Sequence, residues 1–259
     1  MSKHSKKKMD KKDIILNLLR FIFIITLIIS AIYIVKWVKD ERENKKIEEK
    51  VFEAVIVEEN ITGNEEVIEP EYNIDFAKLK ETNNDIVAWL KVNGTNVEYP
   101  VVQANDNNYY LKRNLDKKFN FAGWIFMDYK NKLDGTDKNI VVYGHNRKDG
   151  SMFGSLKNIL TEEWYNNEEN YIIDFITENE KQKYKVFSVY KIAKEDYYID
   201  TYFKGNEFEK FVQTLRKRSV KDFGIQPTAD DTILTLSTCA NNNQYRVVLH
   251  AVFLDGDVK

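Results

Sequence analysis

The longest apolar run of the chain lies near its N-terminus, over residues 14–38. Its centre, residues 21–35, carries no charge, and Arg20 and Lys36 stand at the two ends of that centre. About 20 apolar residues in a helix are enough to cross the roughly 30 Å hydrocarbon core of a bilayer. The two cations can reach the interfaces, and Trp37 suits the interfacial aromatic belt. The pattern therefore predicts a transmembrane anchor over residues 14–38.

Lysines are frequent in residues 1–13, which precede this run. Positive charge beside a span marks its cytoplasmic side, so we expect a cytoplasmic tail over residues 1–13 and an extracellular location for the rest of the chain. A cleavable signal peptide is the alternative, with an apolar region of about 7–15 residues that ends at small residues. The run is longer than that, and bulky Tyr33 and Trp37 follow Ser30 and Ala31. An uncleaved anchor in the cell membrane is the favoured interpretation.

Polar residues dominate after the apolar run. Residues 39–50 mix both charges, which allows the helix to continue, and residues 53–71 are acidic and contain Gly63 and Pro70 as helix breakers. We interpret residues 39–71 as a charged and acidic linker. The folded domain is then expected over residues 72–259.

Short strand-like runs follow one another through this domain. Runs rich in β-branched and aromatic residues predict strands, and they cover residues 97–102, 123–127, 139–143, 171–176, 184–192, 232–238 and 245–253. Pro100 makes the first of them an edge strand or a bend.

Helical spacing is clearest where four apolar residues recur between residues 208 and 215. The pattern predicts a helix over residues 206–220, with Asn206 and Glu209 resembling a capping box. Short helices are expected at residues 73–81 and 85–90, and a helical turn at residues 107–113. The domain is thus mainly β with added helices, most simply a barrel or a sandwich.

The composition of the chain excludes several classes of function. A net charge of −2 supplies no basic field for nucleic acid. One cysteine excludes an internal disulfide, and three histidines with one cysteine are too few for a cysteine-rich zinc site. Neither a metal-ligand spacing nor a phosphate-binding glycine loop is apparent, so we expect no metal and no cofactor.

The single cysteine, Cys239, ends a predicted strand whose two faces differ. Leu234 and Leu236 share one face, whereas Thr235, Ser237 and Cys239 share the other. A lone cysteine is most often a small buried hydrophobe. On an extracellular domain a free thiol at the polar end of a strand suggests instead a nucleophile.

A cysteine nucleophile needs a nearby cation and a proton carrier. Arg246 lies on the polar face of the next predicted strand, where it can meet Cys239 and stabilise an oxyanion. His145 follows a predicted strand at a turn-rich stretch and is the candidate proton carrier. His4 lies in the cytoplasmic tail, and His250 lies about 13 Å along the strand from Arg246, which suggests a structural role.

Three segments resemble the signature segments of sortases, the membrane-anchored cysteine transpeptidases of Gram-positive cell walls. They are Tyr143-Gly-His145-Asn, Thr235-Leu-Ser-Thr-Cys239 and Arg246-Val-Val. Residues 84–92, 97–103 and 106–111 and the helix at 206–220 resemble class B sortases in particular. The resemblance implies a closed eight-stranded β-barrel with N-terminal helices and one long helix before the last two strands.

The same resemblance implies a two-step acyl transfer. Cys239 would attack the Thr carbonyl of a C-terminal sorting motif in a secreted protein and form a thioester. His145 would protonate the leaving peptide, Arg246 would stabilise the oxyanion, and a peptidoglycan precursor amine would resolve the thioester. Further positions match the substrate groove of class B: Asn107, Leu111, Tyr143, Tyr198, Ile199 and Ser237.

Two departures concern the loop after the cysteine. Ala240 and Asn241 stand where this class often carries an acid, and the connection to Arg246 is short. These departures bear on substrate preference more than on the reaction. Two alternative functions are an extracellular cysteine protease that uses water and an anchored adhesion or sensor domain without enzymatic activity.

Overall fold

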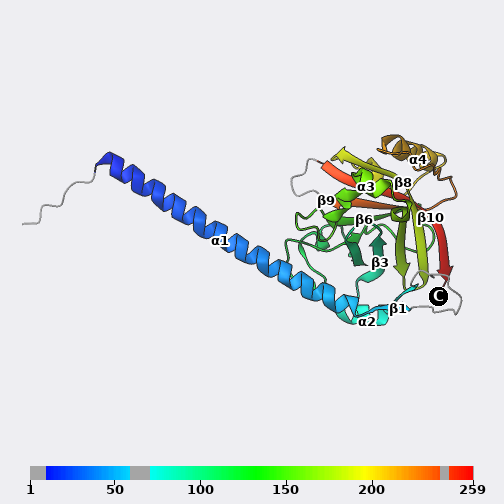
Figure 1. Cartoon of the computed structure of the whole chain (residues 1–259), viewed down its shortest axis with the longest axis horizontal. Helices are drawn as coiled ribbons and strands as arrows, with labels where there is room; N and C mark the ends of the chain where they lie inside the picture. Colours follow the sequence, from blue (N-terminus) through cyan, green and yellow to red (C-terminus); the bar gives the residue numbers. More distant parts are fainter. Residues whose placement is uncertain (1–9, 59–70, 240–244, 259) are drawn as a thin grey trace, which may run out of the picture. The chain divides into compact units, whose positions relative to one another are not determined.

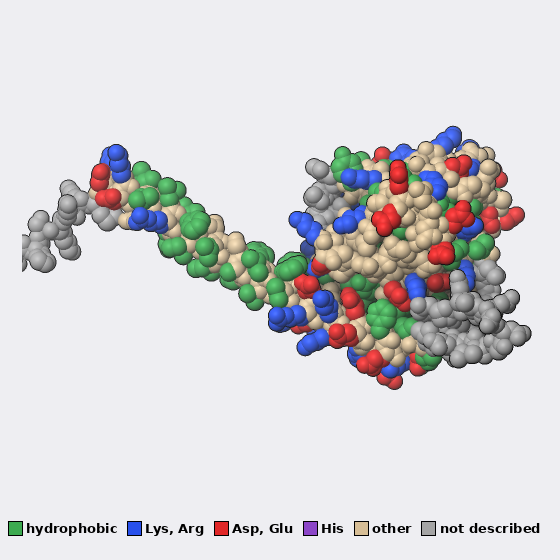
Figure 2. All heavy atoms as spheres, viewed as in Figure 1, with side chains coloured by type: hydrophobic (Ala, Val, Ile, Leu, Met, Phe, Trp, Pro, Cys, Tyr) green, Lys and Arg blue, Asp and Glu red, His purple; other side chains and the backbone are tan. Residues whose placement is uncertain are grey.

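The computed structural model describes residues 10–58, 71–239 and 245–258 (Figure 1). The chain divides into two compact units, Met1–Glu43 and Asn44–Lys259. The first unit is formed by most of α1, a helix over Lys11–Phe52. Its apolar side chains are exposed on all sides, as the green atoms of Figure 2 illustrate. An 18-residue window has a mean hydropathy of 2.6, so α1 is long and apolar enough to span a membrane, a property that signal sequences share.

The second unit is built on a closed eight-stranded barrel. The strands, in their order around it, are β10 (Tyr245–Val258), β8 (Glu180–Ala193), β7 (Ile172–Thr177), β3 (Ile86–Val92), β4 (Val97–Val102), β5 (Phe126–Met127), β6 (Asn139–His145) and β9 (Ile233–Cys239). The pairs β4–β5 and β6–β9 are parallel, and the other pairs are antiparallel. Of the two architectures that the sequence left open, the barrel is therefore correct.

The two faces of the last strands match the predicted alternation. Leu234, Leu236 and Leu249 face the barrel interior and belong to its main apolar core. Ile233 and Val248 face outward and pack beneath α4, the helix over Glu207–Arg218. The polar face that ends at Cys239 is thus the outer face of the barrel.

Helix α4 confirms the predicted long helix before the last two strands, but its expected capping box does not form. Asn206 makes no capping hydrogen bond through its side chain. Instead the Glu207 carboxylate accepts from the Lys204 amide at 2.7 Å. The Asn206 backbone, with φ −92° and ψ 15°, lies outside the extended region usual for an N-cap, which accounts for the missing side-chain bond.

The helices before the barrel differ from those expected. Residues 85–90 were predicted to be helical, yet residues 86–90 form part of β3, which pairs with β4 on one side and β7 on the other. Short apolar runs fit a buried strand as well as a helix, and here the pairing on both edges decides. The turn expected at residues 107–113 is a shorter 3₁₀ turn, η1 (Tyr109–Lys112), and α2 covers Phe76–Thr82.

The remaining elements are short. They are β1 (Val55–Glu58), β2 (Glu71–Ile74), η2 (Ser155–Leu160), α3 (Glu162–Tyr165), η3 (Glu168–Tyr171) and η4 (Tyr197–Ile199). Strands β1 and β2 pair in a small separate sheet. Residues 59–70 of the expected linker lie outside the described residues, and the boundary expected at residue 72 stays a prediction. Within the stretch 39–71, Asn44, Ile47 and Val51 are buried in the second unit.

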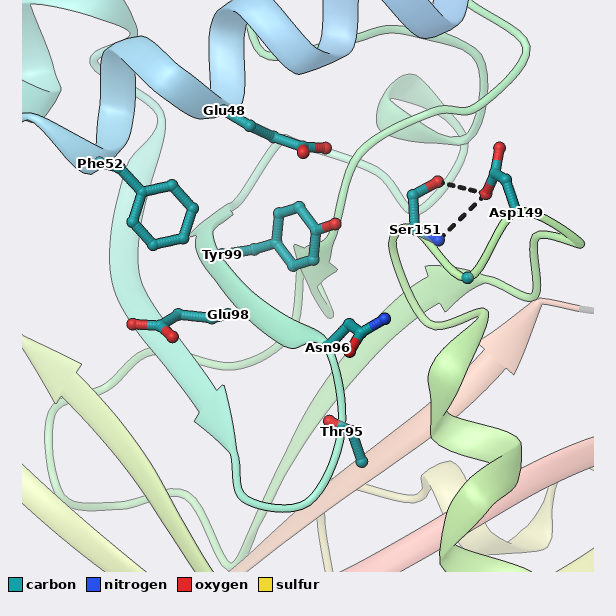
Figure 3. A pocket seen from close by; sticks show the side chains of 9 residues that line it. Glu48, Phe52, Thr95, Asn96, Glu98, Tyr99, Asp149 and Ser151 are labelled. Carbon is teal, nitrogen blue, oxygen red and sulfur yellow. Dashed lines mark hydrogen bonds between the residues drawn. The ribbon is translucent and has the colours of Figure 1, made fainter.

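A polar pocket of about 350 Å³ lies where the end of α1 meets β4 and the turn after β6 (Figure 3). Glu48 of α1 points into it beside Tyr99 and Asp149. Burial raises the pKa of Glu48 to about 7; Asp149 adds to this shift, whereas the hydrogen bond with Tyr99 opposes it. The Glu48 carboxyl therefore binds a proton more tightly in the folded state than in the unfolded state.

Glu48→Gln is expected to make the chain more stable at pH 8 and to leave its stability at pH 5 nearly unchanged. Because the folded-state pKa of Glu48 lies above the ordinary 4.5, the contribution of this group to stability is greatest below pH 4.5. It is lost as the pH rises through about 7. Glutamine stays neutral throughout, so we expect a Tm gain of roughly 2–4 °C at pH 8 in a domain of this size. Thermal unfolding of both forms between pH 5 and 8 measures it, with exposed Glu49→Gln as the control. Parallel curves for the parent and Glu48→Gln would contradict the expectation.

Candidate active site

Two parallel strands bring the predicted histidine and cysteine together. In the pairing of β6 with β9, His145 is the register partner of Cys239. Adjacent strands lie about 4.8 Å apart, and register partners on parallel strands present their side chains to the same face. The backbones of both residues are thus neighbours at the end of the barrel. The Cys239 side chain and residues 240–244, including Ala240 and Asn241, lie outside the described part of the chain.

Arg246 begins β10 on the other side of β9. Val248 pairs with Ser237 in this antiparallel ladder, so continuing the register by two residues sets Arg246 opposite Cys239. The Val247 amide donates to the Thr238 hydroxyl at 2.9 Å and holds the two strands together at this point. Cys239 therefore has His145 on one neighbouring strand and Arg246 on the other.

Two polar atoms beside Cys239 are buried and have no hydrogen-bond partner among the described residues. They are Nδ1 of His145 and Nη1 of Arg246. An unpaired buried polar group costs about 1–3 kcal/mol, and proteins seldom keep one without a use. Their position on both sides of the candidate nucleophile suggests that a bound substrate completes their hydrogen bonding.

The other ring nitrogen of His145 is engaged. Nε2 lies 2.7 Å from the carbonyl oxygen of Leu111. Because a carbonyl can only accept, we assign the Nε2 proton to this bond. In the neutral ring, Nδ1 is then the nitrogen with the available lone pair.

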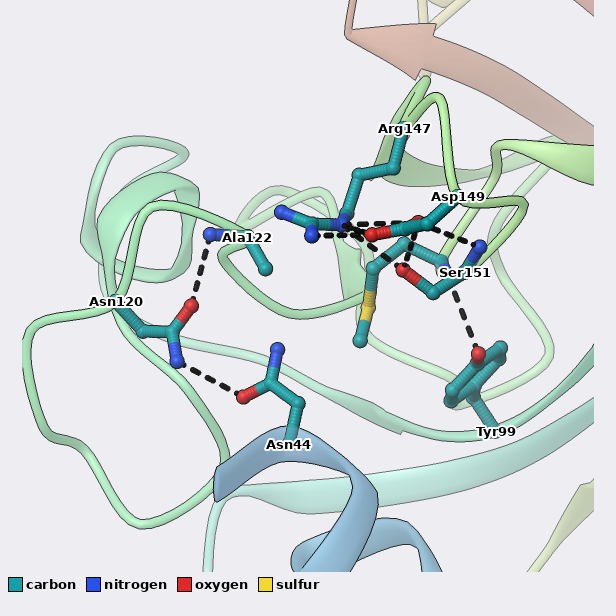
Figure 4. Close-up of polar contacts among 8 residues, drawn as sticks. Asn44, Tyr99, Asn120, Ala122, Arg147, Asp149 and Ser151 are labelled. Carbon is teal, nitrogen blue, oxygen red and sulfur yellow. Dashed lines mark hydrogen bonds and ion pairs between the residues drawn. The ribbon is translucent and has the colours of Figure 1, made fainter. Parts of the chain in front are cut away.

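The turn after His145 is held by an ion pair between Arg147 and Asp149 (Figure 4). Arg147 is 8% exposed, and its Nε donates to Asp149 and, at 2.9 Å, to Ser151. Burial opposes ionisation of Asp149, but the bonds from Arg147 and Ser151 outweigh it and lower the pKa of Asp149. The amides of Arg147 and Phe153 both donate to the His145 carbonyl, which fixes the end of β6.

Asn107 and Tyr143 meet at a residue that the sequence did not single out. The Asp128 carboxylate accepts from Asn107 Nδ2 and from the Tyr143 hydroxyl, each at 2.8 Å. Asp128 is 3% exposed. A single acid after a short strand carries no distinctive sequence signal, so contacts alone reveal it.

Ser237 and Tyr198 also lie together. The Tyr198 hydroxyl is 3.0 Å from the Ser237 hydroxyl, and both residues are buried. Ser237 is in turn the register partner of Tyr143. Ile199 is half-buried and packs against both apolar clusters. The predicted groove residues are therefore brought together around the ends of β6 and β9, although Leu111 contacts the site through its carbonyl.

His250 lies four residues along β10 from Arg246 and contacts the ring of Tyr198, with ring centroids 6.4 Å apart. Its surroundings agree with the structural role predicted for it. It is fully buried, with its ring nitrogens 2.8 Å from the hydroxyls of Tyr190 and Thr235. Burial lowers the pKa of His250 to about 3, so its ring stays neutral. A neutral ring with both nitrogens engaged is a poor proton carrier.

Comparison with known proteins agrees with this arrangement. The family model of the sortase domain matches residues 90–253. Sortase B of Staphylococcus aureus is 31% identical over 229 residues, which cover 86% of this chain and 89% of that protein. Sortase B of Listeria monocytogenes is 34% identical over 193 residues, which cover 74% of this chain and 76% of that protein.

Solved structures give the same result. Sortase B from Bacillus anthracis in complex with AAEK1 has a TM-score of 0.71 and 35% identity, and the match covers 84% of this chain and 99% of that one. A Staphylococcus aureus sortase B–substrate complex has a TM-score of 0.65 and 34% identity over 70% of this chain and 84% of that one. A sortase B complexed with triglycine has a TM-score of 0.66 and 34% identity over 70% of this chain and 85% of that one. The chain therefore belongs to the sortase family, as a sortase-type cysteine transpeptidase of the sortase B group.

Proposed function

We propose that the chain cuts the C-terminal sorting motif of secreted proteins at a threonine and transfers the acyl group to a peptidoglycan precursor amine. Cys239 is the nucleophile, His145 the proton carrier and Arg246 the oxyanion donor. One observation carries the proposal: Nδ1 of His145 and Nη1 of Arg246, which have no hydrogen-bond partner among the described residues, belong to the two strands that flank the strand carrying Cys239. A nucleophile between a proton carrier and a free donor is the arrangement that acyl transfer needs.

Acylation uses all three residues. The Cys239 thiolate attacks the threonine carbonyl carbon, and the carbonyl oxygen becomes an oxyanion that accepts from Arg246. When the intermediate collapses, the carbon–nitrogen bond breaks and the leaving amine takes a proton from Nδ1 of His145. A thioester on Cys239 and a released peptide result.

Deacylation reverses these roles. The acceptor amine attacks the thioester carbon and gives its proton to Nδ1 of His145, the nitrogen that the Leu111 carbonyl leaves available. Arg246 again stabilises the oxyanion, and the Cys239 thiolate departs. The new amide joins the secreted protein to the amine, and the enzyme returns to its starting state.

Substrate binding is proposed for the residues around this centre. Ser237 and Tyr198 supply two adjacent hydroxyls, and Leu111 supplies an apolar side chain. The Tyr143 hydroxyl is already bonded to Asp128, so Tyr143 offers its ring to a substrate. Asn107 bonds to the same carboxylate, and we expect Asp128 to hold both residues in place.

The cellular setting follows from α1. We propose that residues 14–38 remain as a membrane anchor, with the N-terminus cytoplasmic and the barrel extracellular, where secreted proteins and wall precursors are available. The lysines before the apolar run support this orientation. The substrate and triglycine complexes of related sortase B proteins support a peptide donor and an amine acceptor.

Triglycine is expected to divert the product of cleavage from the free acid to an amide. Full-length protein in detergent micelles is incubated with a library of quenched fluorescent peptides that vary around a threonine. Products of the peptide cut fastest are then identified by mass spectrometry with and without triglycine. Because an amine attacks a thioester far better than water does at neutral pH, we expect the amide to dominate. If the free acid is the sole product whatever amine is added, the chain is a protease. If no peptide is cleaved and the Cys239 thiol does not react with an alkylating reagent, the non-enzymatic alternative is favoured.

A further inference from the structure

The buried face of α1 contains one polar residue. Asn44, Ile47 and Val51 follow helical spacing and are all buried in the second unit. A buried amide is costly unless it is hydrogen-bonded. Asn44 meets this need with Asn120, which is fully buried and donates through Nδ2 to Asn44 Oδ1 at 2.9 Å (Figure 4).

Asn120 in turn fixes the segment that precedes β5. The side-chain Oδ1 of Asn120 accepts from the backbone amide of Ala122 at 2.8 Å. The backbone amide of Asn120 donates to the Lys112 carbonyl at 3.0 Å. The Trp124 amide donates to the Tyr110 carbonyl at 3.0 Å. The carbonyl groups of the residues before and after Leu111 are therefore held by this segment.

Leu111 and Gly123 together set the position of the His145 ring. The Leu111 carbonyl bonds to Nε2, and a Cβ on Gly123 would lie 2.9 Å from Cδ2 of His145 and 2.8 Å from the Leu111 oxygen. Gly123 also has a φ of +60°, which a side chain would strain. The imidazole thus rests on backbone that the Asn44–Asn120 pair anchors to α1.

We propose that Asn44 and Asn120 are positioning residues for His145 and act through the Leu111 carbonyl. The inference rests on the proposed role of His145 as proton carrier. It makes the helix that follows the apolar segment a part of the catalytic arrangement, rather than a tether alone. A misplacement of about 1 Å in a catalytic group can reduce a rate by about a hundredfold, so a single buried amide pair can matter to turnover.

Nuclear magnetic resonance of the histidine rings tests the positioning directly. The chain has three histidines, so ¹⁵N-histidine labelling of the full-length protein in detergent micelles gives a simple spectrum. At a pH where the His145 ring is neutral, we expect the parent to be the tautomer protonated at Nε2. In Asn44→Ala we expect a mixture of tautomers and, for the Nε2 proton, at least about tenfold faster exchange with water because its hydrogen bond opens more often.

Turnover of the peptide selected from the library provides the second measurement. Asn44→Ala should lower kcat by about tenfold to a hundredfold and leave KM within about twofold, because proton transfer and not peptide binding is impaired. Asn44→Asp keeps an acceptor oxygen for Asn120 and should regain most of the loss. Val51→Ala removes an apolar contact from the same helix face and should lower Tm without changing kcat or the tautomer.

An unchanged spectrum and kcat in Asn44→Ala would overturn the inference. The same result in Val51→Ala as in Asn44→Ala would also overturn it, because helix stability and not the amide pair would then be responsible. His145→Ala separates the two levels of the argument. If His145→Ala keeps its turnover, the catalytic role of His145 is wrong, while the tautomer spectrum still decides whether Asn44 positions the ring.

Discussion

Cys239→Ala is expected to abolish formation of the acyl-enzyme. The chain has no second thiol, and the described part of the site places no other nucleophile beside both His145 and Arg246. Removing the nucleophile of a serine protease costs a factor on the order of 10⁶ in turnover, and we expect a comparable loss here. Mass spectrometry of the protein after incubation with the selected peptide measures the acyl adduct directly.

The variant should remain folded, because alanine keeps the Cβ and the strand that Cys239 ends. Val247 still donates to Thr238 beside it, and His145 and Arg246 stay on the flanking strands. Peptide binding should therefore persist while the adduct disappears. Cleavage of the same peptide by Cys239→Ala, at more than a trace of the parent rate, would remove Cys239 from the mechanism.

The strand positions of the candidate catalytic residues were predictable because strand alternation has a period of two. Leu234 and Leu236 identify the inner face of β9, and this places Cys239 on the outer face without any knowledge of the fold. The same reasoning applied to β10 sets Arg246 on the side of Cys239. Local periodicity therefore carries most of the information about which side chains can meet.

Alternation was less informative where a short apolar run had two possible structures. Residues 85–90 suit a helix by local pattern, but residues 86–90 pair with β4 on one side and β7 on the other and form a central strand. β7 is distant in sequence, and although β4 follows β3 after a short turn, pairing on both edges is not visible in the local pattern. The capping box at Asn206 did not form because the Asn206 backbone is not in the extended conformation usual for an N-cap.

Contacts made by backbone atoms were beyond prediction from residue types. Leu111 was singled out as an apolar groove residue, yet its carbonyl is what fixes the His145 ring. Asp128 and Asn120 act through buried hydrogen bonds to residues far along the chain. Neither residue type nor spacing marks such partners, because a polar side chain in a loop is usually solvated.

Arg246→Lys is expected to lower the acylation rate by a factor of about a hundred to a thousand. Lysine keeps the positive charge but lacks the planar fork, so it cannot donate at once to the oxyanion and to a second substrate carbonyl. Loss of one oxyanion donor typically costs roughly 2.7–4 kcal/mol of transition-state stabilisation. Nη1 of Arg246, which is buried and has no hydrogen-bond partner in the described part of the chain, is the donor that this substitution removes.

The pH dependence of the acylation rate separates two roles for this arginine. If Arg246 serves mainly to favour the thiolate by its charge, Arg246→Lys should keep most of the rate at every pH, because the charge remains. If Arg246 donates to the oxyanion, the acylation rate of Arg246→Lys should fall by a similar factor at every pH, and peptide affinity should change little. The missing hydrogen bond exists in the transition state and not in the bound ground state. Pre-steady-state acylation of the parent and Arg246→Lys decides between them, with Arg216→Lys on α4 as the control for a loss of guanidinium remote from the site. A rate for Arg246→Lys within a few-fold of the parent would reject the oxyanion role and leave Arg246 as a source of charge alone.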